Sequence, residues 1–234
     1  MKYGDTSSYI HPEGWLFVGL FGIAAIALSF VGWPFFMIGL VLFGWCIYFF
    51  RNPPRVTPIR PGLVVSPADG KIVAIEQVKP DAGLGLGDQT RTRISIFLNV
   101  FDVHVNRSPI AGDVVHMQYR QGKFLNASLD KASVDNERMA IALQLTGEHG
   151  YAGQRLGVVQ IAGLIARRIV CKAQKGQPLK AGERYGIIRF GSRTDVYLPV
   201  GLQPLVTVGQ YMLGGETVLA DCLSHEVARE GEIR

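Results

Sequence analysis

Three residues of this chain combine a reactive side chain with a sequence context that could support catalysis, and Ser192 is the first of them. Ser192 completes the only Gly-Ser dipeptide of the chain and is bracketed by Arg189 and Arg193. A serine hydroxyl is a weak nucleophile that needs a nearby base, and Gly-Ser is also an ordinary turn between strands. The surrounding sequence, RFGSRT, is not Gly-x-Ser-x-Gly, so the nucleophile elbow of the serine hydrolases is not expected.

His104 and Asp69 are the other two candidates. His104 lies in the segment FDVHVNRSP, where strand alternation would place Asp102, His104 and Asn106 on one face. A histidine beside a carboxylate is a plausible general base, although a single strand histidine is more often structural. Asp69 precedes Gly70, and Asp-Gly is common in hairpin turns. Taken alone, each residue has both a catalytic and a structural interpretation.

The elements that must position these residues are short and mostly extended. Apolar segments separated by Gly, Pro and Asp predict strands at residues 63–65, 71–78, 93–100, 102–106, 113–120, 139–146, 156–162, 184–190, 195–199 and 217–220. Residues 163–171 fit either a helix or a strand, residues 79–92 predict a flexible glycine-containing loop, and residues 123–138 predict a long polar loop. The expected fold class is mainly β, with a sandwich or barrel-sandwich-like catalytic domain.

An internal similarity supports the same fold class. Residues 64–75 and 206–220 each place small turn residues between short apolar runs, as the two halves of biotinyl and lipoyl carrier sandwiches do. Those carriers present a modifiable lysine in a tight hairpin, and Lys71 lacks that context. A non-catalytic, membrane-tethered β-sandwich carrier or adaptor module therefore stays open as the alternative function.

The N-terminal part of the chain is strongly apolar. No charged residue occurs between Trp15 and Phe50, and one helix of that length would measure about 54 Å, against roughly 30 Å of bilayer hydrocarbon. Pro34 removes a backbone donor and disfavours helix in the residue before it. We therefore expect two short apolar helices, at residues 15–31 and 35–50, that form two spans or a re-entrant hairpin.

Residues 1–50 are accordingly predicted to be an N-terminal helical membrane anchor. A cleaved signal peptide is a poor alternative, because its apolar region would be about 7–15 residues long and Phe49-Phe50-Arg51 is a bad cleavage site. A helical hairpin buried in a soluble core is the remaining alternative.

A proline-rich linker, residues 51–62, separates this anchor from a single domain of residues 63–234. Arg51, Arg55 and Arg60 follow the apolar region directly, and positive residues beside a span favour the cytoplasmic side. A hairpin would return the N-terminus to that same side. The domain is thus expected to lie against the inner leaflet.

The composition excludes several other classes of function. The net charge of +5 suits an anionic lipid surface, but no basic stripe with interleaved aromatic residues indicates nucleic-acid binding. Cys46, Cys171 and Cys222 are few and widely separated, so neither a disulfide framework nor a zinc site is predicted. No metal is expected.

Several motifs occur together in a recognisable order. After the apolar segment come RNPPR, SPADGKI, FLNVFDVHVNRSP, GKFLNASLDKAS followed by NER, RYGIIRFGSRTDVYLP, and VGQ followed by GGETVLA. This arrangement resembles the phosphatidylserine decarboxylase family, specifically its short bacterial and archaeal type. The resemblance covers nearly the whole chain, and the motifs are specific because they occur in register.

The resemblance implies a proenzyme that cleaves itself between Gly191 and Ser192. The products would be a β chain of residues 1–191 and an α chain of residues 192–234. Ser192 would attack the peptide bond before it and then become a covalent pyruvoyl group, the cofactor of the enzyme. Asp69 and His104 match the aspartate and the first histidine of the family's motifs, which assigns them to activation of Ser192 or to proton handling.

Two positions depart from the family pattern. Many relatives carry a second histidine where this chain has Arg107, so either His104 takes both roles or Arg107 contacts an anion instead. The cleavage sequence is Phe190-Gly191-Ser192, in place of the Leu-Gly-Ser of the longer enzymes.

The implied reaction converts phosphatidylserine to phosphatidylethanolamine and CO₂ through a Schiff base, and His104 would return a proton to the α-carbon. Arg107, Arg189 and Arg193 are candidates for binding the lipid phosphate, because arginine matches phosphate geometry; a solvated face is the alternative for the last two. The implied partners are the phospholipid substrate, the membrane, the chain's own α and β products, and a second copy in a homodimer. The implied location is the inner membrane of the cell, with the catalytic domain on the cytoplasmic side.

Overall fold

The computed structural model describes residues 8–122, 136–163, 168–189 and 191–232. Most of the predicted polar loop at 123–138 and part of the ambiguous segment at 163–171 therefore lie outside the described residues. The chain divides into two compact units, one of Met1–Pro54 with Phe101–Val103 and one of Arg55–Val100 with His104–Arg234.

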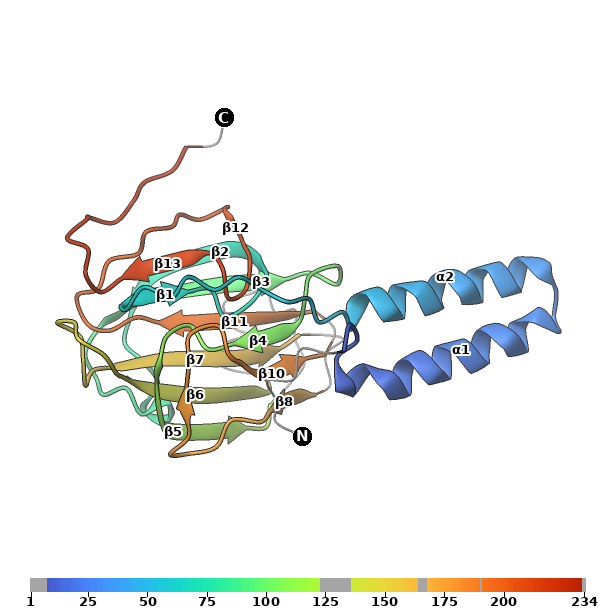
Figure 1. Ribbon diagram of the computed structural model, residues 1–234, viewed down its shortest axis with the longest axis horizontal. Coiled ribbons are helices and arrows are strands. Elements are labelled where there is room, and N and C mark those ends of the chain that lie inside the picture. Colours follow the sequence, from blue (N-terminus) through green and yellow to red (C-terminus); the bar gives the residue numbers. More distant parts are fainter. Residues whose placement is uncertain (1–7, 123–135, 164–167, 190, 233–234) are drawn as a thin grey trace. The chain divides into compact units, whose positions relative to one another are not determined.

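The first unit is built around a helical hairpin. A short 3₁₀ turn, η1 (Pro12–Gly14), leads into α1 (Trp15–Ser29), and α2 (Trp33–Phe49) runs back beside it (Figure 1). Pro34 lies in the first turn of α2, where its missing N–H is not needed. A Cβ atom at Gly39 would lie 2.8 Å from the Cα of Ala25, so the glycine allows the two helices to pack closely. The predicted interruption of the apolar region is confirmed.

The apolar side chains of this hairpin largely face outward. The side chains of Leu16, Ile23 and Phe30 are 70%, 68% and 88% exposed, which is the reverse of what a hairpin in a soluble core would show. By length and composition, the helical stretch Pro12–Ser29 is sufficient to cross a membrane, whereas Trp33–Phe49 is shorter. The hairpin therefore has the surface of a lipid-facing element.

Among the described residues of the second unit, the strands form three antiparallel sheets (Figure 1). The strands of the main sheet are β2 (Gly70–Val78), β3 (Arg91–Leu98), β5 (Gly112–Arg120), β6 (Arg138–Leu145), β7 (Arg155–Ala162), β9 (Pro178–Leu179), β11 (Ser192–Tyr197) and β12 (Tyr211–Met212). Their order across the sheet is β12-β2-β3-β11-β7-β6-β5-β9. The smaller sheets are β4 (Val105–Arg107), β10 (Arg184–Ile188) and β8 (Ile169–Cys171), and the pair β1 (Leu63–Val65) and β13 (Val218–Asp221). Register shifts in β2 and β5 add twist and help the main sheet to curl.

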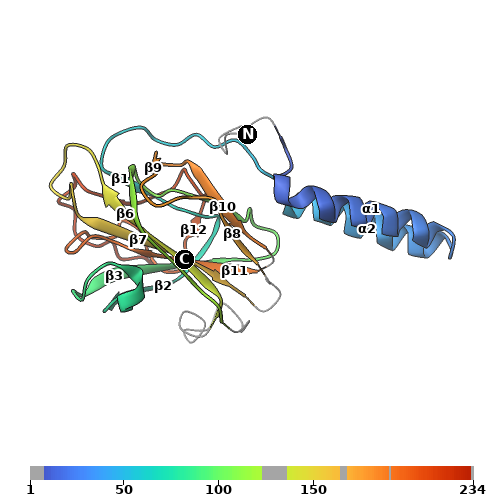
Figure 2. The same cartoon turned by 90° about the horizontal axis from the view of Figure 1, so that it is seen from below.

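The hydrophobic core lies between the main sheet and the smaller sheets. Ile96 of β3 and Val196 of β11 belong to the same buried cluster as Tyr185 of β10 and Leu219 of β13. Figure 2 shows β8 and β10 beside the main sheet, and an added Cβ at Gly186 of β10 would lie 3.0 Å from a side-chain atom of β7. The two-layer arrangement confirms the predicted mainly β, sandwich-like fold.

Two strand predictions around the candidate residues need correction. The predicted strand at 102–106 begins only at Val105, because β10 forms its ladder with residues 105 to 107 and the chain turns at residues 101 and 102. The predicted strand at 195–199 instead begins at Ser192. Its polar start, Ser-Arg-Thr-Asp, masked the alternation of a strand that is buried on both faces. The two-residue strands β9 and β12 were not predicted.

The segment 79–92 is ordered rather than the flexible loop that its glycines predicted. It contains η2 (Ala82–Leu84), and Leu84 and Leu86 are only 2% and 4% exposed. These leucines pack on the outer face of the main sheet in one cluster with Val159 and Ile161. Hydrophobic anchoring, which the glycine count concealed, holds the loop.

Candidate active site

Ser192 begins the central strand of the main sheet. It pairs with Leu98 of β3 on one side and with Ala162 of β7 on the other. Ser192 is fully buried, and its Oγ has no hydrogen-bond partner among the described residues. A buried hydroxyl without a partner is unfavourable by about 1–3 kcal/mol, so its retention calls for a functional explanation.

Gly191 supplies the turn before this serine. Its φ is +61°, which is the left-handed region that residues with a side chain rarely adopt. A Cβ atom at this position would meet nothing within 4 Å, so the requirement for glycine is conformational and not steric. The turn carries the chain from β10 in the small sheet to β11 in the main sheet.

His104 lies next to the end of β10. It is fully buried, and its backbone oxygen accepts a hydrogen bond from the backbone N–H of Ile188 at 3.2 Å. Ile188 is the last residue of β10 and lies just before the turn that leads to Ser192. The histidine is thus tied to the strand that delivers the Gly191–Ser192 bond.

A buried polar network places His104 and Ser192 at the same end of the two layers. Asn106 of β4 donates a hydrogen bond from Nδ2 to Thr194 Oγ1 at 3.5 Å and accepts one at Oδ1 from Gln160 Nε2 at 2.7 Å. Ser192 and Thr194 share one face of β11, and His104 stands two residues before Asn106. The face of β11 that holds Ser192 is therefore the face that β4 covers.

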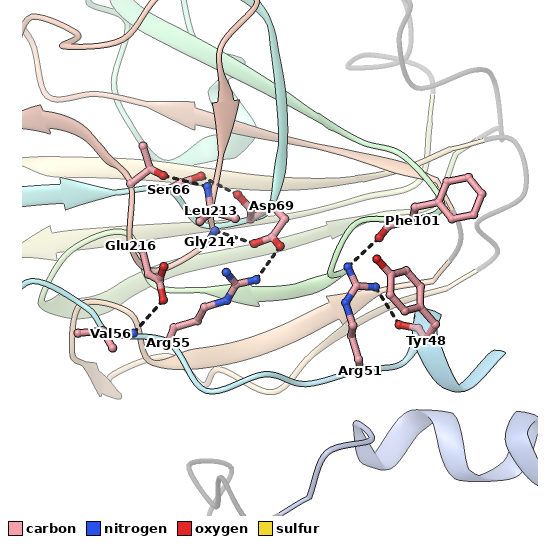
Figure 3. A network of polar contacts seen from close by, with 12 residues as sticks. Tyr48, Arg51, Arg55, Val56, Ser66, Asp69, Phe101, Leu213, Gly214 and Glu216 are labelled. Atoms are coloured by element: carbon pink, nitrogen blue, oxygen red, sulfur yellow. Dashed lines mark hydrogen bonds and ion pairs between the residues drawn. The ribbon is translucent and has the colours of Figure 1, made fainter. Parts of the chain in front are cut away.

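Figure 3 shows two of the contacts that hold Asp69. Its Oδ1 accepts a hydrogen bond from the backbone N–H of Gly214 at 2.7 Å, and its Oδ2 forms an ion pair with Arg55 Nη2 at 2.6 Å. A Cβ atom at Gly70 would collide with the backbone oxygen of Phe97. Asp-Gly is therefore not a hairpin turn here, because Gly70 begins β2 at a point where its backbone lies close to the neighbouring strand β3.

Asp69 belongs to a group of charged side chains around Arg107. Burial, together with the nearby charges of Arg184 and Arg55, lowers the pKa of the Arg107 guanidinium to about 10, against the opposing effect of Asp69 and Glu216. Among the described residues of this group, three arginines face two carboxylates. The excess positive charge makes the group suited to an anion.

The two arginines that flank the Gly-Ser turn differ in their surroundings. Arg193 is 1% exposed and forms a bidentate ion pair with Asp195, with Nε–Oδ1 and Nη2–Oδ2 distances of 2.8 and 2.9 Å. Because neighbouring strand residues point to opposite faces, Arg193 also lies on the face opposite Ser192. This placement favours a structural role for Arg193. Arg189 is half-buried beyond the end of β10.

The structure brings some of the predicted residues together and leaves others apart. Ser192 Oγ makes no hydrogen bond among the described residues, so neither Asp69 nor His104 is bonded to it in this state. Sequence reasoning had not assigned a site role to Arg55, nor to the amide groups of Asn106 and Gln160. Gln160 was detectable as one polar residue inside the apolar segment LGVVQIA.

Within the described ranges, no group of three or more His, Cys, Asp or Glu side chains is arranged to hold a metal ion. Cys46, Cys171 and Cys222 are free thiols. The buried serine, the histidine and the charged group around Asp69 are therefore the candidate reactive elements in the described part of the second unit.

Comparison with known proteins gives one consistent result. Residues 42–220 match the family described as phosphatidylserine decarboxylase. The chain is 55% identical over 225 residues to the phosphatidylserine decarboxylase proenzyme of Cereibacter sphaeroides, with 96% of this chain and 95% of the relative covered. It is 53% identical to the proenzyme of Paramagnetospirillum magneticum, covering 96% and 92%, and 54% identical to that of Ruegeria pomeroyi, covering 94% and 99%. The chain therefore belongs to the phosphatidylserine decarboxylase family.

Proposed function

We propose that this protein is a membrane-anchored proenzyme that cleaves itself between Gly191 and Ser192 and then decarboxylates phosphatidylserine to phosphatidylethanolamine and CO₂. The observation that carries the proposal is the buried Ser192 hydroxyl, which has no hydrogen-bond partner among the described residues and directly follows a glycine in the left-handed conformation. Membership of the family supports the carboxy-lyase activity and the processing of a precursor.

Self-cleavage uses the serine and the glycine together. The Ser192 hydroxyl adds to the carbonyl carbon of Gly191, and the nitrogen of Ser192 leaves, so that an ester replaces the peptide bond. β-Elimination then breaks the Cβ–Oγ bond and leaves a carboxylate on Gly191 and a dehydroalanine at residue 192. Water converts this residue to a pyruvoyl group and releases ammonia. A base must take the serine proton, and His104 or Asp69 fills that role.

The residues present fit a pyruvoyl group at position 192. This group would supply a carbonyl that accepts the electron pair left when CO₂ departs. His104, tied to the end of β10, is the candidate that returns a proton to the substrate α-carbon. Arg107 and Arg189 are candidates for the lipid phosphate, whereas a phosphate would have to displace Asp195 to reach Arg193.

The outward-facing apolar residues of α1 and α2 support membrane anchoring by the hairpin. The arginines that follow it favour the cytoplasmic side of the inner membrane, where the substrate is reached without leaving the bilayer. The homodimer implied by the family resemblance stays a prediction, which the molar mass of the detergent-solubilised protein would test.

The test of the function compares two buried serines on neighbouring strands. Ser192→Ala is expected to leave the purified full chain uncleaved on a denaturing gel and inactive on phosphatidylserine vesicles. Ser95→Ala is the matched control, because Ser95 of β3 is also fully buried and its Oγ also lacks a hydrogen-bond partner among the described residues. Its chain should be cleaved and active.

Two outcomes would contradict this function. Decarboxylation by the Ser192→Ala chain would exclude the pyruvoyl group at residue 192. A wild-type chain that stays intact when folded, and whose residue 192 keeps its hydroxyl, would instead favour the non-catalytic membrane-tethered carrier. Intact mass of the small product, which should lack a free amino terminus, separates self-cleavage from adventitious proteolysis.

A further inference from the structure

Arg55 makes the shortest described contact to the Asp69 carboxylate. The two side chains are only 11% and 6% exposed, and the Nη2–Oδ2 distance is 2.6 Å. A charge-assisted hydrogen bond of this length is among the stronger polar contacts in proteins, and it is little screened because water is largely excluded. Arg55 is therefore well placed to control Asp69.

The backbone around Arg55 is also held in place. The N–H of Val56 donates to Glu216 Oε1 at 2.9 Å, and Glu216 lies on the turn between β12 and β13. The same turn supplies the Gly214 N–H that binds the second oxygen of Asp69 (Figure 3). The arginine and the amide thus reach the carboxylate from two segments that are themselves joined.

Each oxygen of Asp69 consequently has its own donor. Oδ1 is bound by the Gly214 amide and Oδ2 by the Arg55 guanidinium. Two donors in different directions restrict rotation of the carboxylate and stabilise its negative charge. A base for proton transfer needs both a fixed orientation and the ionised state.

We propose that Arg55 is a positioning residue for self-cleavage, which holds the Asp69 carboxylate ionised and in one orientation. This inference rests on the proposed function, because it requires that Asp69 take part in the activation of Ser192. It extends that function to a residue of the proline-rich segment that follows the membrane hairpin. The direct contact of Arg55 is with Asp69, so its effect on cleavage is exerted through the aspartate.

The chain contains a matched control for this ion pair. Arg60, from the same segment, pairs with Asp221 of β13, but its side chain is 49% exposed. Pairs exposed to this degree contribute little to stability. Arg60→Gln therefore removes an arginine–aspartate contact of the same chemical type without affecting Asp69.

The experiment follows cleavage of the newly synthesised full chain, made in a cell-free system with phospholipid vesicles, on denaturing gels over time. Arg55→Gln is expected to slow cleavage by at least about tenfold, whereas Arg60→Gln should cleave at the wild-type rate. Arg55→Lys keeps the charge but is shorter and lacks the guanidinium N–H that reaches Asp69 Oδ2, so it should restore part of the rate. Asp69→Asn and Ser192→Ala serve as references.

The pH profile separates positioning from a purely structural role. The charged groups near Asp69 are Arg55 and Arg107, with Arg184 and Glu216 close to Arg107. Loss of the Arg55 charge makes ionisation of Asp69 harder, so the acidic limb of the cleavage rate should move to higher pH. A structural role would lower the rate by the same factor at every pH.

Folding is checked in the Ser192→Ala background, where all chains stay uncleaved. Both precursors, Arg55→Gln and Arg60→Gln, should unfold cooperatively above the assay temperature, the Arg55→Gln precursor at the lower temperature because its broken ion pair is the more buried one. If the Arg55→Gln precursor does not fold, Arg55→Lys decides: a slowed rate with a shifted acidic limb supports the inference, and a wild-type rate and profile overturn it.

The inference and the function fail in different ways. If Arg55→Gln cleaves as fast as Arg60→Gln, or if its acidic limb does not move, the positioning role is wrong while self-cleavage at Ser192 stands. If the Ser192→Ala chain is itself cleaved or active, the proposed function is wrong. If Asp69→Asn cleaves normally, Asp69 has no part in the reaction and the inference falls with it.

Discussion

The helical hairpin exposes many apolar side chains, whereas the β unit buries several polar ones. In α1 and directly after it, Leu16, Ile23 and Phe30 are mostly exposed, whereas the central strand β11 buries Ser192, Arg193 and Asp195. The first pattern suits a solvent of lipid chains, in which an outward apolar residue needs no specific partner. The second requires a partner for each polar group. Ser192 Oγ and Ser95 Oγ, which lack a partner among the described residues, are therefore exceptions that carry information about the β unit.

The largest stability effect should follow from breaking the buried ion pair of the β unit. Asp195→Asn removes the charge that forms a bidentate ion pair with the fully enclosed Arg193, and the Asp195 charge also acts on Arg93. We expect a loss of about 3–5 kcal/mol, seen as a fall of roughly 10 °C in the melting temperature of the detergent-solubilised Ser192→Ala precursor.

Glu76→Gln is the matched control for this variant. Glu76 pairs with Arg93, but its side chain is 43% exposed, so its loss should lower stability by no more than about 1 kcal/mol. If both variants lowered the melting temperature equally, burial would not make the Asp195–Arg193 pair contribute more to stability than a surface pair.

An added charge on the hairpin tests the other half of the comparison. Ile23 is 68% exposed in the middle of α1, so Ile23→Lys would be harmless in water but would oppose insertion by roughly 3 kcal/mol in lipid. We expect the fraction of chain recovered in alkali-washed membranes to fall. Ile59→Lys, at a 98% exposed position after the hairpin, should leave that fraction unchanged, and equal recovery of both variants would argue against a lipid-facing α1.

The smallest expected effect concerns the turn before the serine. Gly191→Ala adds a Cβ that meets nothing within 4 Å, so only the left-handed φ of +61° opposes it, by about 1–2 kcal/mol. Cleavage should slow by about tenfold without being abolished. Gly176→Ala, at another open position with a φ of +85°, has the same conformational strain and should leave the cleavage rate unaltered. A wild-type cleavage rate for Gly191→Ala would show that cleavage does not depend on the left-handed conformation of residue 191.

Much of the fold could be predicted because it depends on local patterns. The apolar region and Pro34 predicted two helices and the break between them. Continuous apolar segments predicted most strands of the main sheet to within about two residues. The errors lie where burial contradicts polarity, as at the start of β11, or where a strand depends on one partner, as β4 depends on β10.

The candidate site could be predicted only in part. Ser192, His104 and Asp69 were identified from motifs that follow one another along the chain. These motifs can be recognised from residue types alone, without knowledge of the fold. Arg55 was interpreted only as a charge beside the membrane, because its contact with Asp69 depends on how two distant segments pack. The opposite facing of Ser192 and Arg193 was likewise hidden until the strand was known to begin at residue 192.

The sequence by itself determined the mainly β class, the apolar hairpin and the family, since each rests on residue types at fixed spacing. Only the tertiary structure decided which polar groups are paired and which are not: Arg193 with Asp195, Asp69 with Arg55 and Gly214, and Ser192 Oγ with none of the described residues. The physical reason is that pairing depends on distance and burial, which long-range antiparallel strand pairing sets and sequence spacing does not.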